Sequence, residues 1–340
     1  MTLYSLREGH ARHAQKGHPE RPARLDAVRR QIDADPLLSG LVRARGPAAS
    51  WESLERVHSA AYLDTLVAFC ETGGGMLDVD TYATADSWAV ARESAGDLLH
   101  LTERVLSGEA SGAFAIGRPP GHHARPSQAM GFCLLSNVAV AARHAQSLGA
   151  ERVLIVDFDV HHGNGTQEAF YDDPSVLFVS SQQADIYPGT GALGETGVGP
   201  GVGATVNLPV PGGTGDGPML DLYRRVLPPL AARFRPDLVL VSAGFDAHRL
   251  DPLGGLALSV AGLADLVRLT MEVADAHARG RIVLTLEGGY DADVLAHGVA
   301  SALRVLQDPA AEASDPFGPS RYASPDLAAL IASVRDLHGL

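Results

Sequence analysis

The stretch RVLIVDFDVHHGNG, residues 152–165, joins an apolar, mostly β-branched run to a cluster of polar side chains. A short apolar run of this kind predicts a buried strand, here Arg152–Phe158, that ends where the polar residues gather. Similar runs predict four further strands at Ala113–Ile116, Ser175–Ser181, Asp237–Ser242 and Arg281–Leu286.

Between these runs, apolar residues recur at three- and four-residue spacing, which predicts helices. The predicted helices are Asn137–Leu148, Met219–Phe234, Val260–Ala278, Ala292–Leu306 and, near the C-terminus, Asp326–Leu337. Because strands alternate with helices, the sequence predicts an α/β fold whose mostly parallel sheet is covered by helices on both faces. The segment Gln182–Gly217 has eleven glycines and no clear periodicity, so we expect a long functional loop there.

Polar clusters follow the predicted strands at residues 117–123, 159–165, 243–248 and 287–290. In parallel α/β sheets, ligands bind beyond the carboxyl ends of the strands. We therefore expect one functional site at this edge of the sheet.

Composition narrows the class of protein. The chain has 340 residues, 46% of them hydrophobic and 20% charged, which is typical of a globular protein and excludes disorder. No repeat or linker divides it, so we expect one domain over 1–340, with a surface segment at 308–324 before the last helix. The net charge of −13 argues against a nucleic-acid partner and mildly favours cationic substrates.

The cellular setting is predicted from what the sequence lacks. No apolar window is long enough for a membrane helix, and Met1–Lys16 has no apolar signal-peptide core. The only cysteines are Cys70 and Cys133, too few for a disulfide framework. We expect a cytoplasmic protein with no membrane partner.

A metal site is predicted after the strand Arg152–Phe158. Asp157, Asp159 and His161 alternate, so they share one face if the extended geometry continues. Carboxylate and imidazole ligands suit Zn²⁺ or another borderline divalent metal, and Asp246 could be a further ligand. The alternative is that Asp157 and Asp159 only bind backbone amides. His162 should point away from the metal, in a structural role.

Acid–base and electrophilic groups follow two other strands. His122 and His123 come after the turn-prone Arg118-Pro-Pro-Gly, and histidine changes charge near neutral pH. Tyr290, after Glu-Gly-Gly, could donate its hydroxyl to a developing oxyanion. The alternatives are a pair of surface histidines and a tyrosine that only packs.

Taken together, these motifs resemble the zinc-dependent histone deacetylase superfamily. In chain order they are RPPGHHA, GFC, DFDVHHGNGTQ, PSVLFVS, AGFDAH, DPLGG and LEGGYD. GHPERPARL and Asn164 make the chain most similar to the class II branch, with bacterial deacetylase-like proteins and acetylpolyamine amidohydrolases. The resemblance extends from about residue 18 to 306. It implies the arginase/deacetylase fold, with the active site at the carboxyl ends of the strands.

The resemblance also implies roles for individual residues. One catalytic Zn²⁺ would have three protein ligands, Asp159, His161 and Asp246. His122 and His123 would be tandem catalytic histidines, partnered by Asp157 and Asn164. Tyr290 would polarise the amide oxygen. A structural K⁺ is common in the family, and its donors match Asp157, Asp159, His161, Ser180 and Ser181.

The substrate tunnel is predicted in the same way. Gly131 and Phe132 would form one wall, and Tyr187 stands where the family usually has phenylalanine. Members that favour polyamines often have an acidic gate at the position of Leu253, although Asp78 or Asp80 could supply an acid from another loop. The apolar Leu253 therefore predicts an acyl-lysine protein or peptide substrate, with acetylpolyamines or other small acyl-amines as the alternative.

Two other functions fit these residues less well. Binuclear manganese ureohydrolases share the fold, but they need further bridging carboxylates, which are missing from both metal-binding motifs. An inactive acyl-amine-binding homologue would have lost a metal ligand, a tandem histidine or Tyr290, and all six are present. The sequence leaves open whether the chain forms a homo-oligomer.

Overall fold

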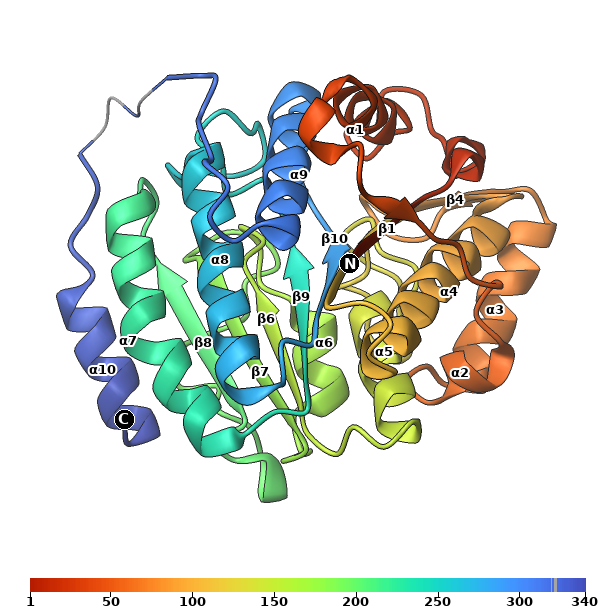
Figure 1. The fold of residues 1–340 in the computed structure, drawn as a ribbon. Helices are drawn as coiled ribbons and strands as arrows, with labels where there is room; N and C mark the ends of the chain where they lie inside the picture. Colours follow the sequence, from red (N-terminus) through yellow and green to blue (C-terminus); the bar gives the residue numbers. More distant parts are fainter. Residues whose placement is uncertain (319, 321–322) are drawn as a thin grey trace.

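The computed structural model describes residues 1–318, 320 and 323–340. In this part of the chain, eight parallel strands form one sheet in the order β2-β1-β5-β10-β9-β6-β7-β8 (Figure 1). The strands are β1 (Thr2–Leu6), β2 (Val42–Arg43), β5 (Gly112–Ile116), β6 (Val153–Asp157), β7 (Val176–Gln183), β8 (Thr205–Val210), β9 (Leu238–Ala243) and β10 (Ile282–Leu286). A separate antiparallel pair contains β3 (Gly74–Met76) and β4 (Tyr82–Thr84).

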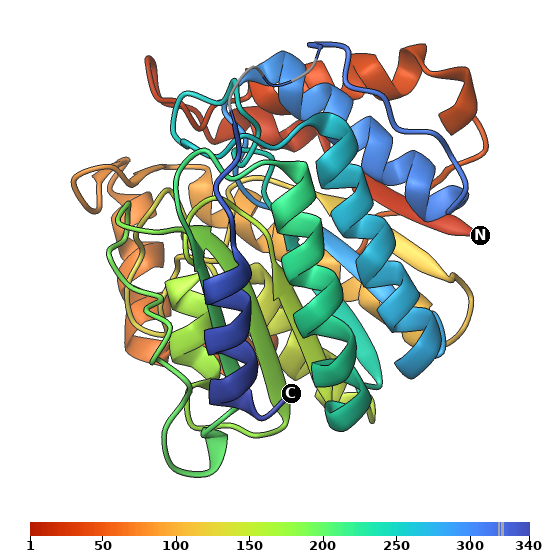
Figure 2. The ribbon, with the colours of Figure 1, turned by 90° about the vertical axis from the view of Figure 1, so that its left-hand side faces the viewer.

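Helices cover both faces of the sheet (Figures 1 and 2). One layer contains α1 (Ala23–Ala34), α7 (Asp216–Phe234), α8 (Val260–His277), α9 (Ala292–Gln307) and α10 (Ala328–His338). The other side has α2 (Trp51–Glu55), α3 (Ala60–Glu71), α4 (Ser87–Leu106), α5 (Asn137–Ser147) and α6 (Asn164–Phe170). Short 3₁₀ helices are η1 (Glu8–Arg12), η2 (Pro36–Leu38) and η3 (Gly199–Gly201). No helix among the described residues has both the length and the apolar character needed to span a membrane.

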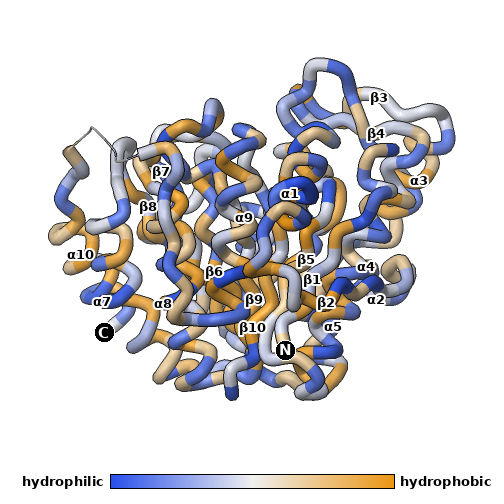
Figure 3. The backbone as a smooth tube through the Cα atoms, turned by 45° about the horizontal axis from the view of Figure 1, so that its top comes forward, coloured by the Kyte–Doolittle hydropathy of each residue, from blue (hydrophilic) through white to orange (hydrophobic). Residues whose placement is uncertain are grey.

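Strand β6 shows why the sheet is buried on both faces. Leu154 and Val156 pack into the core under α7, α8 and α9, whereas Val153 and Ile155 pack under α4 and α5. All four side chains are fully buried. A strand with two apolar faces is stable only between two helical layers, and Figure 3 shows such strands at the centre of the molecule.

The fold prediction is confirmed. The five predicted strands are observed as β5, β6, β7, β9 and β10, and the five predicted helices as α5, α7, α8, α9 and α10. The prediction of a loop over Gln182–Gly217 is wrong in part, because β8 lies inside it. Glycines flank β8 and Pro209 lies within it, which hides the strand in the sequence, but β8 is an edge strand, where proline is tolerated. Residues 319, 321 and 322 of the predicted surface segment lie outside the described residues.

Candidate metal centre and active site

The predicted polar clusters meet beyond the carboxyl ends of β5, β6, β9 and β10. One part of the prediction is wrong: β6 ends at Asp157, so the strand alternation does not continue to Asp159 and His161. The chain turns there instead. Asp157 Oδ1 accepts a hydrogen bond from the Asp159 amide at 3.1 Å, and Asp159 Oδ1 accepts one from the His161 amide at 2.9 Å. These carboxylates therefore do bind backbone amides, and the loop rather than a strand directs Asp159 and His161.

Among the described residues, one cluster of His, Cys, Asp and Glu has the geometry of a metal site. Asp159, His161 and Asp246 each offer a ligand atom, and these atoms all lie within 4.8 Å of one another. Asp246 Oδ1 accepts a hydrogen bond from the Val160 amide, whereas its buried Oδ2 has only the His161 ring nearby, with Nδ1 3.3 Å away and outside good hydrogen-bond geometry. A buried carboxylate oxygen that lacks a well-aligned donor is stabilised by a cation. The donor set, two carboxylates and one imidazole, fits a catalytic Zn²⁺ with an open position.

The electrostatics of this cluster also favour a cation. Burial and the charge of Asp159 raise the pKa of Asp246 to about 7. Burial alone would lower the pKa of His161, but hydrogen bonds with Asp159 and Asp246 raise it to about 10. The two carboxylates thus attract positive charge, and a divalent metal can take the place of the proton.

Two glycines allow the carboxylates to lie this close to the backbone. A Cβ on Gly244 would overlap the Asp159 carboxylate, and a Cβ on Gly288 would overlap that of Asp246. The Gly288 amide donates to Asp159 Oδ2 at 2.8 Å. The glycines of AGFDAH and LEGGYD are therefore explained by close approach to the metal cluster.

The tandem histidines lie beside the cluster, and their ring centroids are 4.0 Å apart. His122 Nδ1 is 3.0 Å from Asp157 Oδ2, and His123 Nδ1 is 2.8 Å from Asn164 Oδ1. Burial lowers the pKa of both rings, but the charges of Asp159 and Asp157 outweigh it at His122 and raise that pKa to about 10. For His123, burial and the charges of His122 and His161 lower the pKa well below its ordinary value. The surroundings thus shift the pKa values of the two rings in opposite directions, which suits an acid and a base.

Glu287 fixes the backbone of the tandem histidines, and the sequence analysis did not single it out. The fully buried carboxylate accepts hydrogen bonds from the amides of Gly121 at 2.6 Å and His122 at 3.1 Å, and from Ser242 Oγ at 3.0 Å. Burial raises the pKa of Glu287 to about 7. In the sequence, the only indication of a role for Glu287 is its place in the motif LEGGYD.

Tyr290 is held from two sides. Asp251 Oδ2 accepts its amide hydrogen at 2.6 Å, and the Arg24 guanidinium lies 4.9 Å from the centre of its ring. Arg24 also donates to the carbonyl oxygens of Gly289 and Glu287, at 2.6 and 2.7 Å. Burial raises the pKa of Tyr290 well above its ordinary value, so the hydroxyl stays protonated and can donate. Arg24 and Asp251 occur in the motifs GHPERPARL and DPLGG but were not predicted as site residues.

A pocket of about 240 Å³ opens onto these groups. It is lined by Asp80, His123, Gly131, Phe132, His161, Tyr187, Leu253 and Tyr290. The four predicted tunnel residues are thus all on its walls. The ring of Tyr187 meets that of His123 edge-on at 5.1 Å, and Leu253 is 38% exposed at the mouth. The sequence offered Asp78 or Asp80 as an acid from another loop, and Asp80 lines the pocket.

The remaining predicted residues have separate surroundings. His162 is buried, with Nδ1 2.8 Å from Thr190 Oγ1 and Nε2 3.0 Å from Gln167 Oε1, in agreement with a structural role. Ser180 Oγ is buried and has no hydrogen-bond partner, whereas the Ser181 hydroxyl is 2.7 Å from Tyr223 Oη. The K⁺ site stays a prediction.

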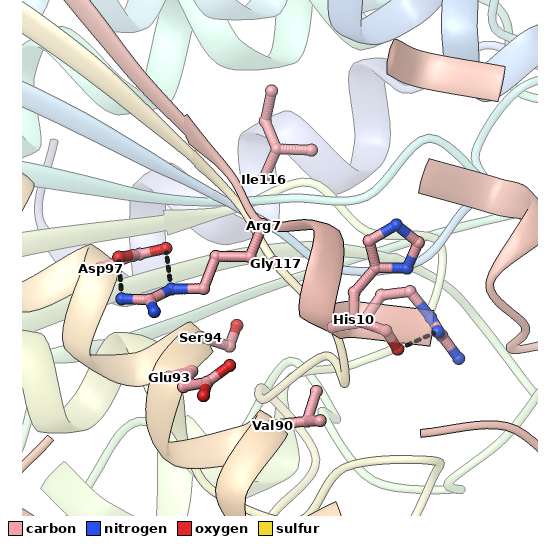
Figure 4. A pocket seen from close by; sticks show the side chains of 9 residues that line it. Arg7, His10, Val90, Glu93, Ser94, Asp97, Ile116 and Gly117 are labelled. Carbon is pink, nitrogen blue, oxygen red and sulfur yellow. Dashed lines mark hydrogen bonds and ion pairs between the residues drawn. The ribbon is translucent and has the colours of Figure 1, made fainter. Parts of the chain in front are cut away.

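A second cavity, between η1, β5 and α4, is unsuited to a substrate (Figure 4). Its volume of about 10 Å³ has room for about one water molecule. Its charged side chains are already paired: Arg7 donates to both carboxylate oxygens of Asp97, at 2.7 and 2.8 Å, and Arg118 donates to the His10 carbonyl at 3.0 Å.

Comparison with known proteins gives one consistent result. A family model described as the histone deacetylase domain matches residues 18–306. Histone deacetylase 10, chloroplastic, of Oryza sativa subsp. japonica is 40% identical over 96% of this chain and 79% of its own. The histone deacetylase-like amidohydrolase of Pseudomonas aeruginosa is 41% identical over 82% of this chain and 73% of its own. The probable deacetylase of Archaeoglobus fulgidus is 39% identical over 86% of this chain and 82% of its own.

A solved structure agrees with these sequence matches. The crystal structure of the HDA15 HD domain is similar to this chain with a TM-score of 0.88 and 34% sequence identity. The match covers 99% of this chain and 95% of the other.

Proposed function

The chain belongs to the histone deacetylase family, and from this premise we propose that it is a Zn²⁺-dependent hydrolase that removes acetyl groups from lysine side chains of proteins or peptides. One observation carries the proposal. The cluster Asp159–His161–Asp246 lies beside a pair of histidines with opposite pKa shifts. One residue of the cluster, His161, lines a single pocket together with His123 and Tyr290.

The metal cluster and its chemistry follow from the donor set. Asp159, His161 and Asp246 would hold the Zn²⁺, which when bound supplies Lewis-acid chemistry for amide hydrolysis. No second group of three such ligands occurs within the described residues, which supports a hydrolase with one catalytic metal rather than a binuclear ureohydrolase.

The protein's own groups handle the protons. Asn164 Oδ1 accepts a hydrogen bond from His123 Nδ1, which leaves Nε2 of the neutral ring to accept a proton from the attacking water. His122 is protonated beside Asp157, so it stabilises negative charge and assists departure of the amine. The Tyr290 hydroxyl donates to the amide oxygen, where charge develops in the transition state.

The walls of the pocket favour acyl-lysine. Phe132, Tyr187 and Leu253 present apolar surface suited to the four methylenes of a lysine stem. An unpaired ammonium in such a slot would lose its hydration without compensation.

A second candidate substrate class is supported by Asp80. Its side chain lines the same pocket and could pair with an ammonium group beyond the acylated end of a polyamine. Small acyl-amines, acetylpolyamines above all, are therefore the alternative substrate.

We also propose that the chain holds a structural K⁺ near β6 and β7. The buried, unpartnered Ser180 Oγ supports this, because K⁺ accepts neutral oxygen ligands. Asp157, Asp159, His161 and Ser181 would complete the donor set.

A substrate panel tests the proposed function. We expect kcat/KM to be higher for acetyl-lysine peptides than for acetylputrescine or acetylspermidine. Asp246→Ala should abolish hydrolysis of every substrate in the panel. Faster hydrolysis of acetylspermidine than of any acetyl-lysine peptide would reassign the substrate, and no hydrolysis of either class would overturn the proposal.

A further inference from the structure

The tunnel wall at Phe132 has a backbone conformation that side chains rarely adopt. Gly131 and Phe132 have φ values of 56° and 68°, at the two central positions of a turn closed by hydrogen bonds between Met130 and Cys133. Two residues with positive φ are typical of a type I′ turn, whose central positions favour asparagine and glycine. A phenylalanine there is strained, so neighbouring groups must hold it in place.

Thr81 makes the hydrogen bond that holds this turn. Its side-chain oxygen accepts the Phe132 amide hydrogen at 3.0 Å, and its hydroxyl donates to Asp80 Oδ1, also at 3.0 Å. Thr81 is fully buried. One hydroxyl therefore connects the backbone of one residue that lines the pocket, Phe132, to the carboxylate of another, Asp80.

The loop that carries Asp80 and Thr81 is fixed at other points as well. The Thr81 carbonyl accepts the Leu77 amide at 2.7 Å. His18 Nδ1 accepts the Glu20 amide, so Nε2 bears the hydrogen and donates to the Asp80 carbonyl at 2.9 Å. The His18 ring also meets the Phe132 ring edge-on at 4.7 Å. With its backbone fixed, the loop leaves the Asp80 side chain to be oriented by the Thr81 hydroxyl.

We infer that Thr81 is a positioning residue for substrate selection: its hydroxyl sets the Phe132 wall and the Asp80 carboxylate in a single arrangement that favours acetyl-lysine peptides with a positive charge beside the acetyl-lysine. The inference rests on the proposed function and deepens it. Without the hydroxyl, the Phe132 amide loses its acceptor and the Asp80 carboxylate turns freely. Substrate binding should then weaken, while the tandem histidines and Tyr290 keep their places.

The experiment compares Thr81→Val, which removes the hydroxyl and keeps the branched shape, with Thr81→Ser, which keeps the hydroxyl. Two acetyl-lysine peptides serve as probes, identical except that arginine beside the acetyl-lysine is replaced by neutral citrulline in the second. For Thr81→Val we expect KM for the arginine peptide to rise about 5- to 10-fold, with a smaller rise for the citrulline peptide and kcat within about 2-fold of wild type. Thr81→Ser should restore wild-type KM values.

A second measurement needs no catalysis. Amide hydrogen exchange at Phe132 should be about 10-fold faster in Thr81→Val than in wild type or Thr81→Ser. Unchanged exchange and unchanged KM in Thr81→Val would overturn the inference. An equal loss of kcat/KM on both peptides, together with a lower melting temperature, would also overturn it, since that is a merely structural effect. If wild-type protein hydrolyses neither peptide, the proposed function fails, and the exchange comparison still decides whether Thr81 holds the turn.

Discussion

Replacement of Tyr290 by phenylalanine removes one hydroxyl and should leave the ring where it is. The backbone is held through the 2.6 Å hydrogen bond to Asp251, and the ring packs edge-on against Phe132 at 5.6 Å and under Arg24 at 4.9 Å. None of these contacts uses the hydroxyl. Tyr290→Phe therefore tests the donor to the amide oxygen with little other change.

The size of the effect follows from what that hydroxyl does. Loss of one donor aimed at a developing oxyanion typically costs about 100- to 1,000-fold in kcat, or about 3–4 kcal/mol in the activation barrier. Because the interaction strengthens only as charge develops, KM should change little. Burial raises the pKa of Tyr290 well above its ordinary value, so the hydroxyl is protonated in neutral solution and the loss should not vary with pH there.

The assay is steady-state hydrolysis of an acetyl-lysine peptide, with zinc content and melting temperature measured on the same samples. Tyr62→Phe is the matched control. That hydroxyl is also buried but donates to the Leu134 carbonyl at 2.6 Å, outside the pocket, so its loss should lower stability by about 1 kcal/mol and leave kcat unchanged. Near-normal turnover by Tyr290→Phe would refute the assignment of Tyr290 as the oxyanion donor.

Three further changes have expected outcomes. Burial would raise the pKa of Glu20, but the charge of Arg118 outweighs burial and lowers that pKa from 4.5 to about 2. As the pH falls, Glu20 is therefore protonated in the unfolded chain before it is protonated in the folded protein. About 3 kcal/mol of stability that is present above pH 4.5 is lost as the pH falls toward 2. Urea denaturation should show this acid loss in wild type but not in Glu20→Gln, which starts less stable because Arg118 is left unpaired. Asn164→Ala frees His123 Nδ1 and should lower kcat about 10- to 100-fold with zinc content unchanged; unaltered kcat would exclude Asn164 as the orienting group. Leu253→Glu should shift the ratio of kcat/KM values toward acetylpolyamines, and an unchanged ratio would show that this position is not the gate.

The sequence predicts those features that depend on local pattern. Val153, Ile155 and their neighbours make a run that only a doubly covered strand can accommodate, and β6 is where the pattern predicts it. Strand β8 has no such pattern, because Pro209 and the flanking glycines hide it and its pairing with β7 is a tertiary contact. The metal ligands were predicted from residue type and motif, although the strand geometry assumed for Asp159 and His161 was wrong.

Residues that support the site through distant backbone contacts could not be predicted. Arg24 binds carbonyl oxygens 263 and 265 positions away, and Glu287 binds amides 165 and 166 positions away. No periodicity or local spacing encodes such contacts. Thr81 belongs to the same class, since only the fold brings its loop beside the turn at Phe132. Asp80 was named from the sequence as one of two acids on that loop, but only the fold shows that it lines the pocket.

Metal content tests the central claim most directly. Wild-type protein purified without chelators should contain about one zinc per chain, and Asp246→Ala should lose most of it while it keeps its helical circular dichroism. Asp172→Ala, an exposed carboxylate, is the matched control and should keep its zinc. Full zinc retention by Asp246→Ala would contradict the metal centre described here, and two manganese ions per wild-type chain with hydrolysis of arginine would contradict the assignment as a deacetylase.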